Sequence, residues 1–296
     1  MDALGSRISK KAKEITFTFE GEEVSAVEGQ SLGAALVGVG HLSHREGRLG
    51  GVHGHYCGMG ACFECLVSVD GHSGVRACMT PVQQNQSVKR HPYKTPFDIE
   101  KQRQSAVRAA SSEVVTTDVL VIGGGPAGLQ AALSAREAGA SVLLIDERTS
   151  LGGQYFKQLS SAYSTQDGNA PDKQMQAGRA LIDKLEKADV QQWRNTLVWG
   201  AFRERADQLQ IGVERNGQAL IVEPRSIVIS TGATERPYPV PGWTLPGVMT
   251  TGGLQTLLRS YRTAPPGPIL VAGNGPLNLQ VAAELVSAGG EGAWRG

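Results

Sequence analysis

The first elements of the chain follow from its pattern of apolar and polar positions. Residues 15–19 alternate strictly, which places Ile15, Phe17 and Phe19 on one face of a strand. Glu20-Gly21 then predicts a turn into a second short strand that ends near residue 27. These positions predict an antiparallel pair with one buried face.

A short helix and a second pair of strands are predicted next. Ser31 is a candidate helix cap, and Leu32, Leu36 and Val39 are expected on one side of that helix. Two further strands, 66–69 and 75–77, are joined through a turn at 70–71. The pattern predicts a small α+β unit that ends near His91.

The composition of the sequence changes over residues 93–116, where charged and small residues are mixed and no apolar stripe is present. We interpret this stretch as a partly helical connector. A buried strand over 119–122 follows, then a glycine-rich turn, a helix over about 129–138 and a second strand over 142–145. This order of elements is typical of a Rossmann βαβ unit.

The remaining half of the chain repeats parts of this pattern. Residues 175–185 predict an amphipathic helix, and Asn216-Gly217 predicts a hairpin inside a β-meander. Residues 227–229 read as a buried strand that ends near Gly232. A second strand, glycine turn and helix begin at Pro268 and run toward residue 288, whereas 289–296 do not read as a further buried strand.

Length and charge limit the possible classes of protein. A chain of 296 residues favours two domains, and a net charge of +1 gives no reason to expect a nucleic-acid partner. No apolar run is long enough for a membrane span or for the core of a signal peptide. We therefore expect a cytoplasmic protein.

All four cysteines lie in one window, at positions 57, 62, 65 and 78. The spacing C-x4-C-x2-C followed by a distant cysteine is that of plant-type 2Fe-2S proteins, so we expect Cys57, Cys62, Cys65 and Cys78 to be the ligands. Gly58 and Gly60 allow the backbone to approach a cluster closely.

Other uses of these cysteines stay open at this point. A structural zinc site usually has two short Cys-x2-4-Cys pairs that are well separated in the sequence. Two disulfides would be typical of a secreted protein, and nothing in the sequence indicates secretion. His53 and His55 precede Cys57 and have the chemistry of Rieske-type ligands, but four cysteines already complete a ligand set.

A dinucleotide site is predicted at the first glycine-rich turn. It reads G-x-G-x-x-G at Gly123, Gly125 and Gly128, between a strand and a helix, and Asp146 closes the second strand at the spacing expected of a ribose ligand. At the second turn, 273–278, the third glycine is replaced by Asn278, which leaves nucleotide binding there open.

Together these motifs resemble the α subunits of bacterial heteromeric amine and opine oxidases and dehydrogenases. That group includes the corresponding components of opine oxidase, sarcosine oxidase, hydrogen cyanide synthase and proline or hydroxyproline dehydrogenase. The resemblance rests on the segments 56–65 and 76–81, on 121–128, on Gly152-Gly153-Gln154, on 231–237 and on 273–277.

The resemblance implies a fold and a set of cofactors. The fold class is an α/β Rossmann-like FAD/NAD(P)-binding domain preceded by a small α+β, β-grasp 2Fe-2S domain. The implied cofactors are a 2Fe-2S cluster and FAD, with NAD or another adenine nucleotide such as ATP as the alternative, and a possible NAD(P) at the second turn. The residues expected to bind the dinucleotide are Gly123, Gly125, Pro126, Ala127, Gly128, Asp146, Gly153, Gln154, Thr231 and Gly232.

The expected domain ranges are an N-terminal tail 1–12, the cluster domain 13–92, a linker 93–116, the FAD domain 117–264 and an incomplete second nucleotide-binding domain 265–296. Members of the group continue beyond this point, so we expect a truncated or frameshifted product. No catalytic residue is predicted, because residues 79–296 hold no cysteine and the flavin domain holds no histidine.

The resemblance also implies a role. Substrate oxidation would occur on a β-type flavoprotein partner, and this chain would pass electrons from an amine, imino acid or opine to a quinone or other small acceptor. Two alternatives remain: a stand-alone NAD(P)H-dependent ferredoxin-type reductase, and an inactive remnant.

Overall fold

The computed structural model describes residues 8–10, 12–93, 114–165, 172–205, 208–236, 239–287 and 292–295. The predicted connector 93–116 lies mostly outside the described residues, and its last three residues belong to a strand. The chain divides into two compact units. Unit 1 holds Met1–Pro96, Leu159–Pro171 and Thr234–Gly296, and unit 2 holds Phe97–Gln158 and Asp172–Ala233.

A five-stranded sheet in unit 1 carries the cysteine segment. Its order is β3-β2-β8-β6-β7, with β2 parallel to β8 and the other neighbours antiparallel. The strands are β2 (Glu14–Phe19), β3 (Glu22–Val27), β6 (Leu66–Val69), β7 (His72–Arg76) and β8 (Ser87–Arg90). Ile15, Phe17 and Phe19 are buried in the core, as the alternating pattern predicted.

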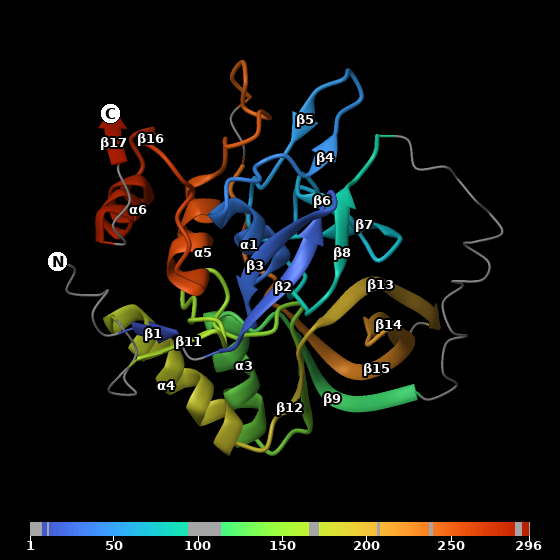
Figure 1. Ribbon diagram of the computed structural model, residues 1–296. Coiled ribbons are helices and arrows are strands. Elements are labelled where there is room, and N and C mark those ends of the chain that lie inside the picture. The colour runs from blue at the N-terminus through green and yellow to red at the C-terminus, as the bar shows by residue number, and fades with distance from the viewer. Residues whose placement is uncertain are drawn as a thin grey trace. The chain divides into compact units, whose positions relative to one another are not determined.

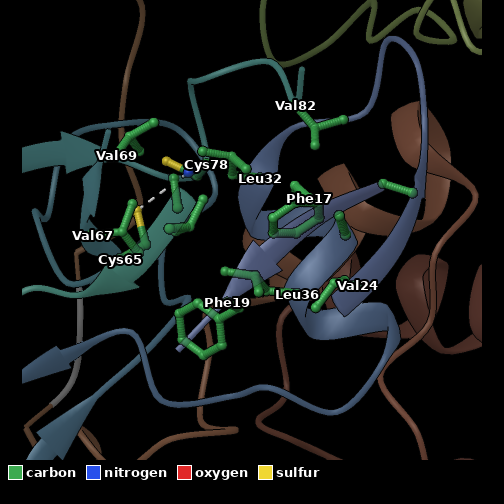
Figure 2. Packing of buried hydrophobic residues seen from close by; sticks show 14 of the residues in the cluster. Phe17, Phe19, Val24, Leu32, Leu36, Cys65, Val67, Val69, Cys78 and Val82 are labelled. Carbon is green, nitrogen blue, oxygen red and sulfur yellow. Dashed lines mark hydrogen bonds between the residues drawn. The ribbon is translucent and has the colours of Figure 1, made fainter. Parts of the chain in front are cut away.

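One short helix, α1 (Leu32–Gly38), covers this sheet and completes its core. The Ser31 side chain accepts a hydrogen bond from Ala34 N–H, so the predicted cap is present. Figure 2 shows Leu32 and Leu36 of α1 facing Phe17 and Phe19, with Cys65 and Cys78 in the same cluster. The expectation for Val39 was wrong, because the helix ends before it and the residue is 52% exposed.

Unit 1 also contains later parts of the chain. Helix α5 (Thr251–Tyr261) packs on α6 (Pro276–Ser287), and two small antiparallel pairs join β4 (Arg45–Glu46) to β5 (Val52–His53) and β1 (Ile8–Lys10) to β11 (Tyr163–Thr165). Strand β16 (Ile269–Ala272) pairs in parallel with β17 (Gly292–Arg295). Residues 292–295 thus form a strand at a place where the sequence predicted no further buried strand, and the strand is defined by its pairing with β16 rather than by a local apolar pattern.

Unit 2 is built on a six-stranded sheet of order β12-β10-β9-β15-β14-β13. Figure 1 labels β9, β12, β13, β14 and β15 of this sheet. The strands are β9 (Val114–Ile122), β10 (Val142–Ile145), β12 (Gln191–Trp193), β13 (Thr196–Arg205), β14 (Gln208–Arg215) and β15 (Gln218–Ile229). β12, β10, β9 and β15 are parallel, and β13, β14 and β15 form the predicted antiparallel meander.

Two helices pack on one face of this sheet. α3 (Pro126–Glu137) and α4 (Lys173–Lys187) share a core with Val121 and Leu144, and Ile182 and Leu185 supply the buried side of α4. The predicted hairpin residues Asn216 and Gly217 both have positive φ, as a tight β-hairpin turn requires.

The end of β15 differs from its prediction as a buried strand. Residues 227–229 do pair with β9, but Ile227 and Val228 are only partly buried and Ile229 is 75% exposed. An apolar run alone does not distinguish a strand covered on both faces from one covered on a single face. Among the described residues, no helix is long and apolar enough to cross a membrane.

Candidate functional site

The four cysteines come together at one end of the sheet in unit 1. Cys57, Cys62 and Cys65 lie on the loop between β5 and β6, and Cys78 follows β7. All four are free thiols; Cys62 is partly exposed and the other three are buried. The structure therefore brings together every cysteine that the sequence singled out.

The thiols interact two by two. Cys62 donates a hydrogen bond to Cys57, which lowers the pKa of Cys57 to about 5, and backbone N–H groups of the loop add to this effect. Cys78 donates to Cys65 and lowers the pKa of Cys65 in the same way. The donor thiols, Cys62 and Cys78, have raised pKa values. In each pair, the thiol that accepts the hydrogen bond therefore ionises more readily than the thiol that donates it.

The backbone of the loop brings its N–H groups close to the cysteine sulfurs. Gly58 and Gly60 have φ of 64° and 79°, in the left-handed region that favours glycine. Backbone N–H groups of Met59 and Glu64 point at the sulfurs of Cys57 and Cys62, at 3.4 and 3.5 Å. The N–H of Cys78 likewise lies 3.4 Å from Cys65 Sγ (Figure 2).

These features match the needs of a two-iron cluster. Such a cluster takes four thiolates, two at each iron, and amide donors to sulfur stabilise its charge. Cys57 with Cys62 and Cys65 with Cys78 form two neighbouring pairs. Within the described parts of the chain, no three His, Cys, Asp or Glu side chains are grouped as one isolated metal ion would require.

Charged side chains hold the outside of the loop. Glu64 accepts two hydrogen bonds from Arg45, at 3.0 and 2.9 Å, and its Oε2 lies 2.6 Å from His53 Nδ1. Arg76 donates to Gly60 O at 3.0 Å. His53, weighed as a Rieske-type ligand, therefore contacts a carboxylate that follows Cys62, which is a supporting position.

Two buried histidines lie behind the loop. His44 and His55 are 0% and 3% exposed, and burial lowers the pKa of His44 to about 3 and that of His55 to about 4. His44 Nε2 donates to His41 O. Neither ring nitrogen of His55 has a hydrogen-bond partner among the described residues.

The N-terminal end of helix α5 packs against the cysteine loop. The N–H of Thr250, its N-cap, donates to Tyr56 O at 3.0 Å, and the Tyr56 ring contacts Trp243. A Cβ built at Gly58 would lie 3.1 Å from Gly253 Cα. The first turn of α5 therefore contacts the backbone on both sides of Cys57.

In unit 2, the predicted dinucleotide motif forms the turn from β9 to α3. Gly123 has φ of 104°, and a Cβ on Gly128 would overlap Gly123 O. Ser230 Oγ donates to the carbonyl oxygens of Ile122 and Gly123, at 2.9 Å each. These contacts fix the close packing of α3 on the strand that the third glycine of the motif permits.

The N-terminus of α3 has the features of a pyrophosphate site. Pro126 and Ala127 begin the helix, Gly125 is its N-cap, and no side chain caps it. Its first N–H groups are therefore the donors that bind phosphate at such a helix end. Gly153 lies beside this turn, since its built Cβ would lie 2.8 Å from Gly125 Cα.

Asp146 links the end of β10 to the glycine turn. Its Oδ2 accepts from Gly124 N–H at 2.6 Å, and its Oδ1 accepts from Arg148 N–H at 2.7 Å. Each carboxylate oxygen retains a second lone pair for a hydroxyl group. The position agrees with a ribose ligand, and the contact to Gly124 adds a structural role.

The remaining predicted residues also lie in unit 2. Gln154 is partly buried and its carbonyl accepts from Lys157 Nζ at 2.9 Å, whereas Thr231 and Gly232 are exposed just after β15. Thr231 Cα would lie 3.2 Å from a Cβ on Gly123, so it borders the glycine turn. Sequence reasoning missed Ser230 and the buried Lys157. The adjacent Thr231-Gly232 turn was a signal for Ser230, and the Gly152-Gly153-Gln154 turn was a signal for Lys157.

The second glycine turn has a different internal arrangement. Asn278 stands at the third glycine position, donates to Ala272 O at 3.1 Å and accepts from the Thr251 hydroxyl. A Cβ on Gly275 would meet no atom within 4 Å. The hydrogen bond to Ala272 O places the Asn278 side chain against the end of β16, where a glycine would have no side chain.

Comparison with known proteins supports both the cysteine-containing domain and the dinucleotide-binding domain. Residues 12–92 match the model of the 2Fe-2S iron-sulfur cluster binding domain, and residues 117–293 match that of pyridine nucleotide-disulphide oxidoreductase. The fold and the sites define an oxidoreductase component with an iron-sulfur domain and a dinucleotide-binding domain. Since the second match spans more than half of the chain, the protein belongs to the pyridine nucleotide-disulphide oxidoreductase family.

Several curated relatives are heteromeric enzyme subunits. The A subunit of opine oxidase from Agrobacterium tumefaciens (strain Ach5) is 39% identical over 182 residues, which is 58% of this chain and 35% of the relative. The HcnB subunit of hydrogen cyanide synthase from Pseudomonas protegens is 35% identical, over 57% of this chain and 36% of the relative. The alpha subunit of sarcosine oxidase from Corynebacterium sp. (strain P-1) is 32% identical, over 60% of this chain and 19% of the relative. The match spans about a third or less of these relatives.

A solved structure supports the same fold. L-proline dehydrogenase from P. horikoshii aligns with a TM-score of 0.75 at 22% identity, over 99% of this chain and 55% of that chain. These findings confirm the family resemblance, the fold class, and 2Fe-2S and FAD as cofactors. The domain boundaries and the individual ligand residues remain predictions.

Proposed function

We propose that this chain is the electron-transferring subunit of a heteromeric oxidoreductase that oxidises an amine, imino acid or opine. The observation that carries the proposal is the presence, in one chain, of a four-cysteine cluster loop and a Rossmann glycine turn. Its likeness to the A subunit of opine oxidase, at 39% identity, supports the substrate class. Substrate oxidation is assigned to a β-type flavoprotein partner.

The two cofactors together allow electrons to pass from a two-electron donor to a one-electron acceptor. A flavin exchanges two electrons with an organic donor, whereas a 2Fe-2S cluster carries one electron at a time. The residues of this chain hold each group in place: Cys57, Cys62, Cys65 and Cys78 bind the cluster, and the turn at 123–128 binds the pyrophosphate of FAD. The acceptor is a quinone or another small molecule.

The direct test is reconstitution with a β-type flavoprotein subunit of an amine- or opine-oxidising enzyme. Dye reduction would be measured with a panel of secondary amines, imino acids and opines. The wild-type pair is expected to reduce the dye with at least one of them, and the Cys57→Ser and Cys65→Ser pairs are not. Full activity in the cysteine variants would refute the relay role.

One observation favours a second candidate, a stand-alone NAD(P)H-dependent reductase. β16, α6 and β17 form a β-α-β arrangement with parallel strands around a second glycine turn. NADH or NADPH would then bleach the bound flavin without any partner protein. The absence of bleaching under anaerobic conditions would leave the amine-oxidising complex as the better account.

A further inference from the structure

A buried imidazole lies against the cysteine loop without a hydrogen-bond partner of its own. His55 is two residues before Cys57 and is 3% exposed. Its ring lies between helix α1 and the loop. A Cβ built at Gly33 would lie 2.9 Å from His55 Nδ1, and one built at Gly58 would lie 3.2 Å from His55 Nε2.

The surroundings of the ring include both cysteine-bearing segments. The space at Gly33 that His55 Nδ1 borders is also bordered by Ala77 and by the Cα of Cys78, both at 3.2 Å. On its other side, Nε2 faces the residue that follows Cys57. His55 therefore lies near the backbone of both cysteine-bearing segments, beside Gly58 and near the Cα of Cys78.

A neutral imidazole always carries one N–H, and a buried N–H is almost always donated to an acceptor. His44 follows this rule, since its Nε2 donates to His41 O. His55 has no acceptor at either nitrogen among the described residues. The contrast between two neighbouring histidines indicates an acceptor that is not part of the polypeptide.

We propose that His55 donates its N–H to a sulfide of the 2Fe-2S cluster, and that this hydrogen bond raises the reduction potential of the cluster. The reduced cluster carries one more negative charge than the oxidised one, so an N–H donor to sulfur stabilises the reduced form more strongly. In this proposal His55 changes the reduction potential of the cluster through a hydrogen bond and does not bind iron.

This inference rests on the cluster of the proposed function but not on its substrate or partner. The test uses the purified chain with its cluster and compares His55→Phe, which keeps the ring volume without a donor, with His55→Gln, which keeps an amide N–H. His72, an exposed residue of β7, gives the control variant His72→Phe.

The midpoint potential would be measured by redox titration followed by electron paramagnetic resonance. We expect His55→Phe to lower the ratio of reduced to oxidised cluster about tenfold at a fixed potential, which is about 59 mV for one electron. His55→Gln is expected to recover part of this shift, and His72→Phe to leave the potential unchanged.

A second readout needs no variant. Wild-type protein labelled with 15N only in histidine imidazole would be examined by pulsed electron paramagnetic resonance in the reduced state, and we expect a weak nitrogen coupling of hydrogen-bond size. A strong coupling would make a histidine a ligand, and no coupling would leave His55 donating to a buried water only; either result overturns the proposal. If His55→Phe retains no iron, the labelled spectrum and the His55→Gln potential decide. A cluster that is present and uncoupled refutes this inference alone, whereas preparations without iron and sulfide refute the proposed function.

Discussion

At the scale of single residues, two glycines of one motif have different tasks. A Cβ on Gly128 would overlap Gly123 O and lie 2.6 Å from Ser230 Oγ, so Gly128→Ala is expected to destabilise the protein by about 1–3 kcal/mol. A Cβ on Gly125 would meet only Gly153 Cα, at 3.8 Å. Gly125→Ala is therefore expected to spare the fold but to weaken FAD binding by roughly tenfold or more.

Urea unfolding of the FAD-free proteins, together with flavin titration, separates the two effects. The account requires a loss of stability in Gly128→Ala and a near wild-type midpoint in Gly125→Ala. Equal stability losses in both variants would contradict it. Wild-type FAD affinity in Gly125→Ala would show that the pyrophosphate does not lie against this glycine.

The buried His44 predicts a dependence of stability on pH. Burial lowers its pKa from 6.5 to about 3, so the unfolded chain binds a proton below pH 6.5 that the folded chain does not bind. This contribution is fully present above pH 6.5 and is lost as the pH falls toward 3. From pH 7 to pH 5 the loss is about 2 kcal/mol.

Unfolding free energies of the wild type and His44→Gln would be compared across that range. The variant is expected to lose about 2 kcal/mol less than the wild type on acidification. His72→Gln, at an exposed position, serves as the control and should follow the wild type. Parallel curves for the wild type and His44→Gln would refute the assignment to His44.

At the scale of elements, the first turn of α5 supports the cysteine loop. A Cβ on Gly253 would overlap Tyr56 O and lie 3.3 Å from the carbonyl carbon of Cys57. Gly253→Ala should therefore displace the loop, cost about 1–3 kcal/mol of stability and speed the loss of iron to a chelator. Its neighbour Gly252 offers a matched control, because a Cβ there would meet only the end of the Glu235 side chain.

Chelator challenge followed by visible absorbance would measure this effect. Faster bleaching is expected in Gly253→Ala than in Gly252→Ala. Identical rates in the two variants would mean that the α5 contact does not hold the cluster loop.

Most elements were predictable from sequence because local signals agreed with tertiary packing. The alternation at 15–19, the Ser31 cap and the Asn216-Gly217 turn all act within a few residues, and all occur in the structure. The failures needed distant information. β17 depends on pairing with β16, and the exposure of Ile229 depends on what covers the sheet.

The same distinction applies to the site. Cysteine spacing and the G-x-G-x-x-G motif identified the candidate ligands because both motifs are contiguous. The contacts of Gly253 with Tyr56 and of Ser230 with Gly123 join residues more than 100 positions apart, and no local pattern announces them. Sequence therefore predicted which residues to examine, and the structure added what holds them.

At the scale of the whole molecule, the candidate ligands of the two cofactors belong to separate hydrophobic cores. Cys65 and Cys78 lie in the core of the first sheet, whereas Val121 and Leu129, which flank the glycine turn, belong to that of unit 2. Cys65→Ser is therefore expected to abolish iron binding while about one FAD per chain is retained. Released flavin and total iron would be measured in the same preparation, and joint loss of both cofactors would contradict this independence.

The central claim is that one chain holds both a 2Fe-2S cluster and FAD. The most direct measurement is the amount of iron, acid-labile sulfide and heat-released flavin per chain after anaerobic purification. The account predicts about two iron, about two sulfide and about one FAD, with visible absorbance that bleaches on reduction. Zinc without sulfide would make the cysteine loop structural and would contradict the account.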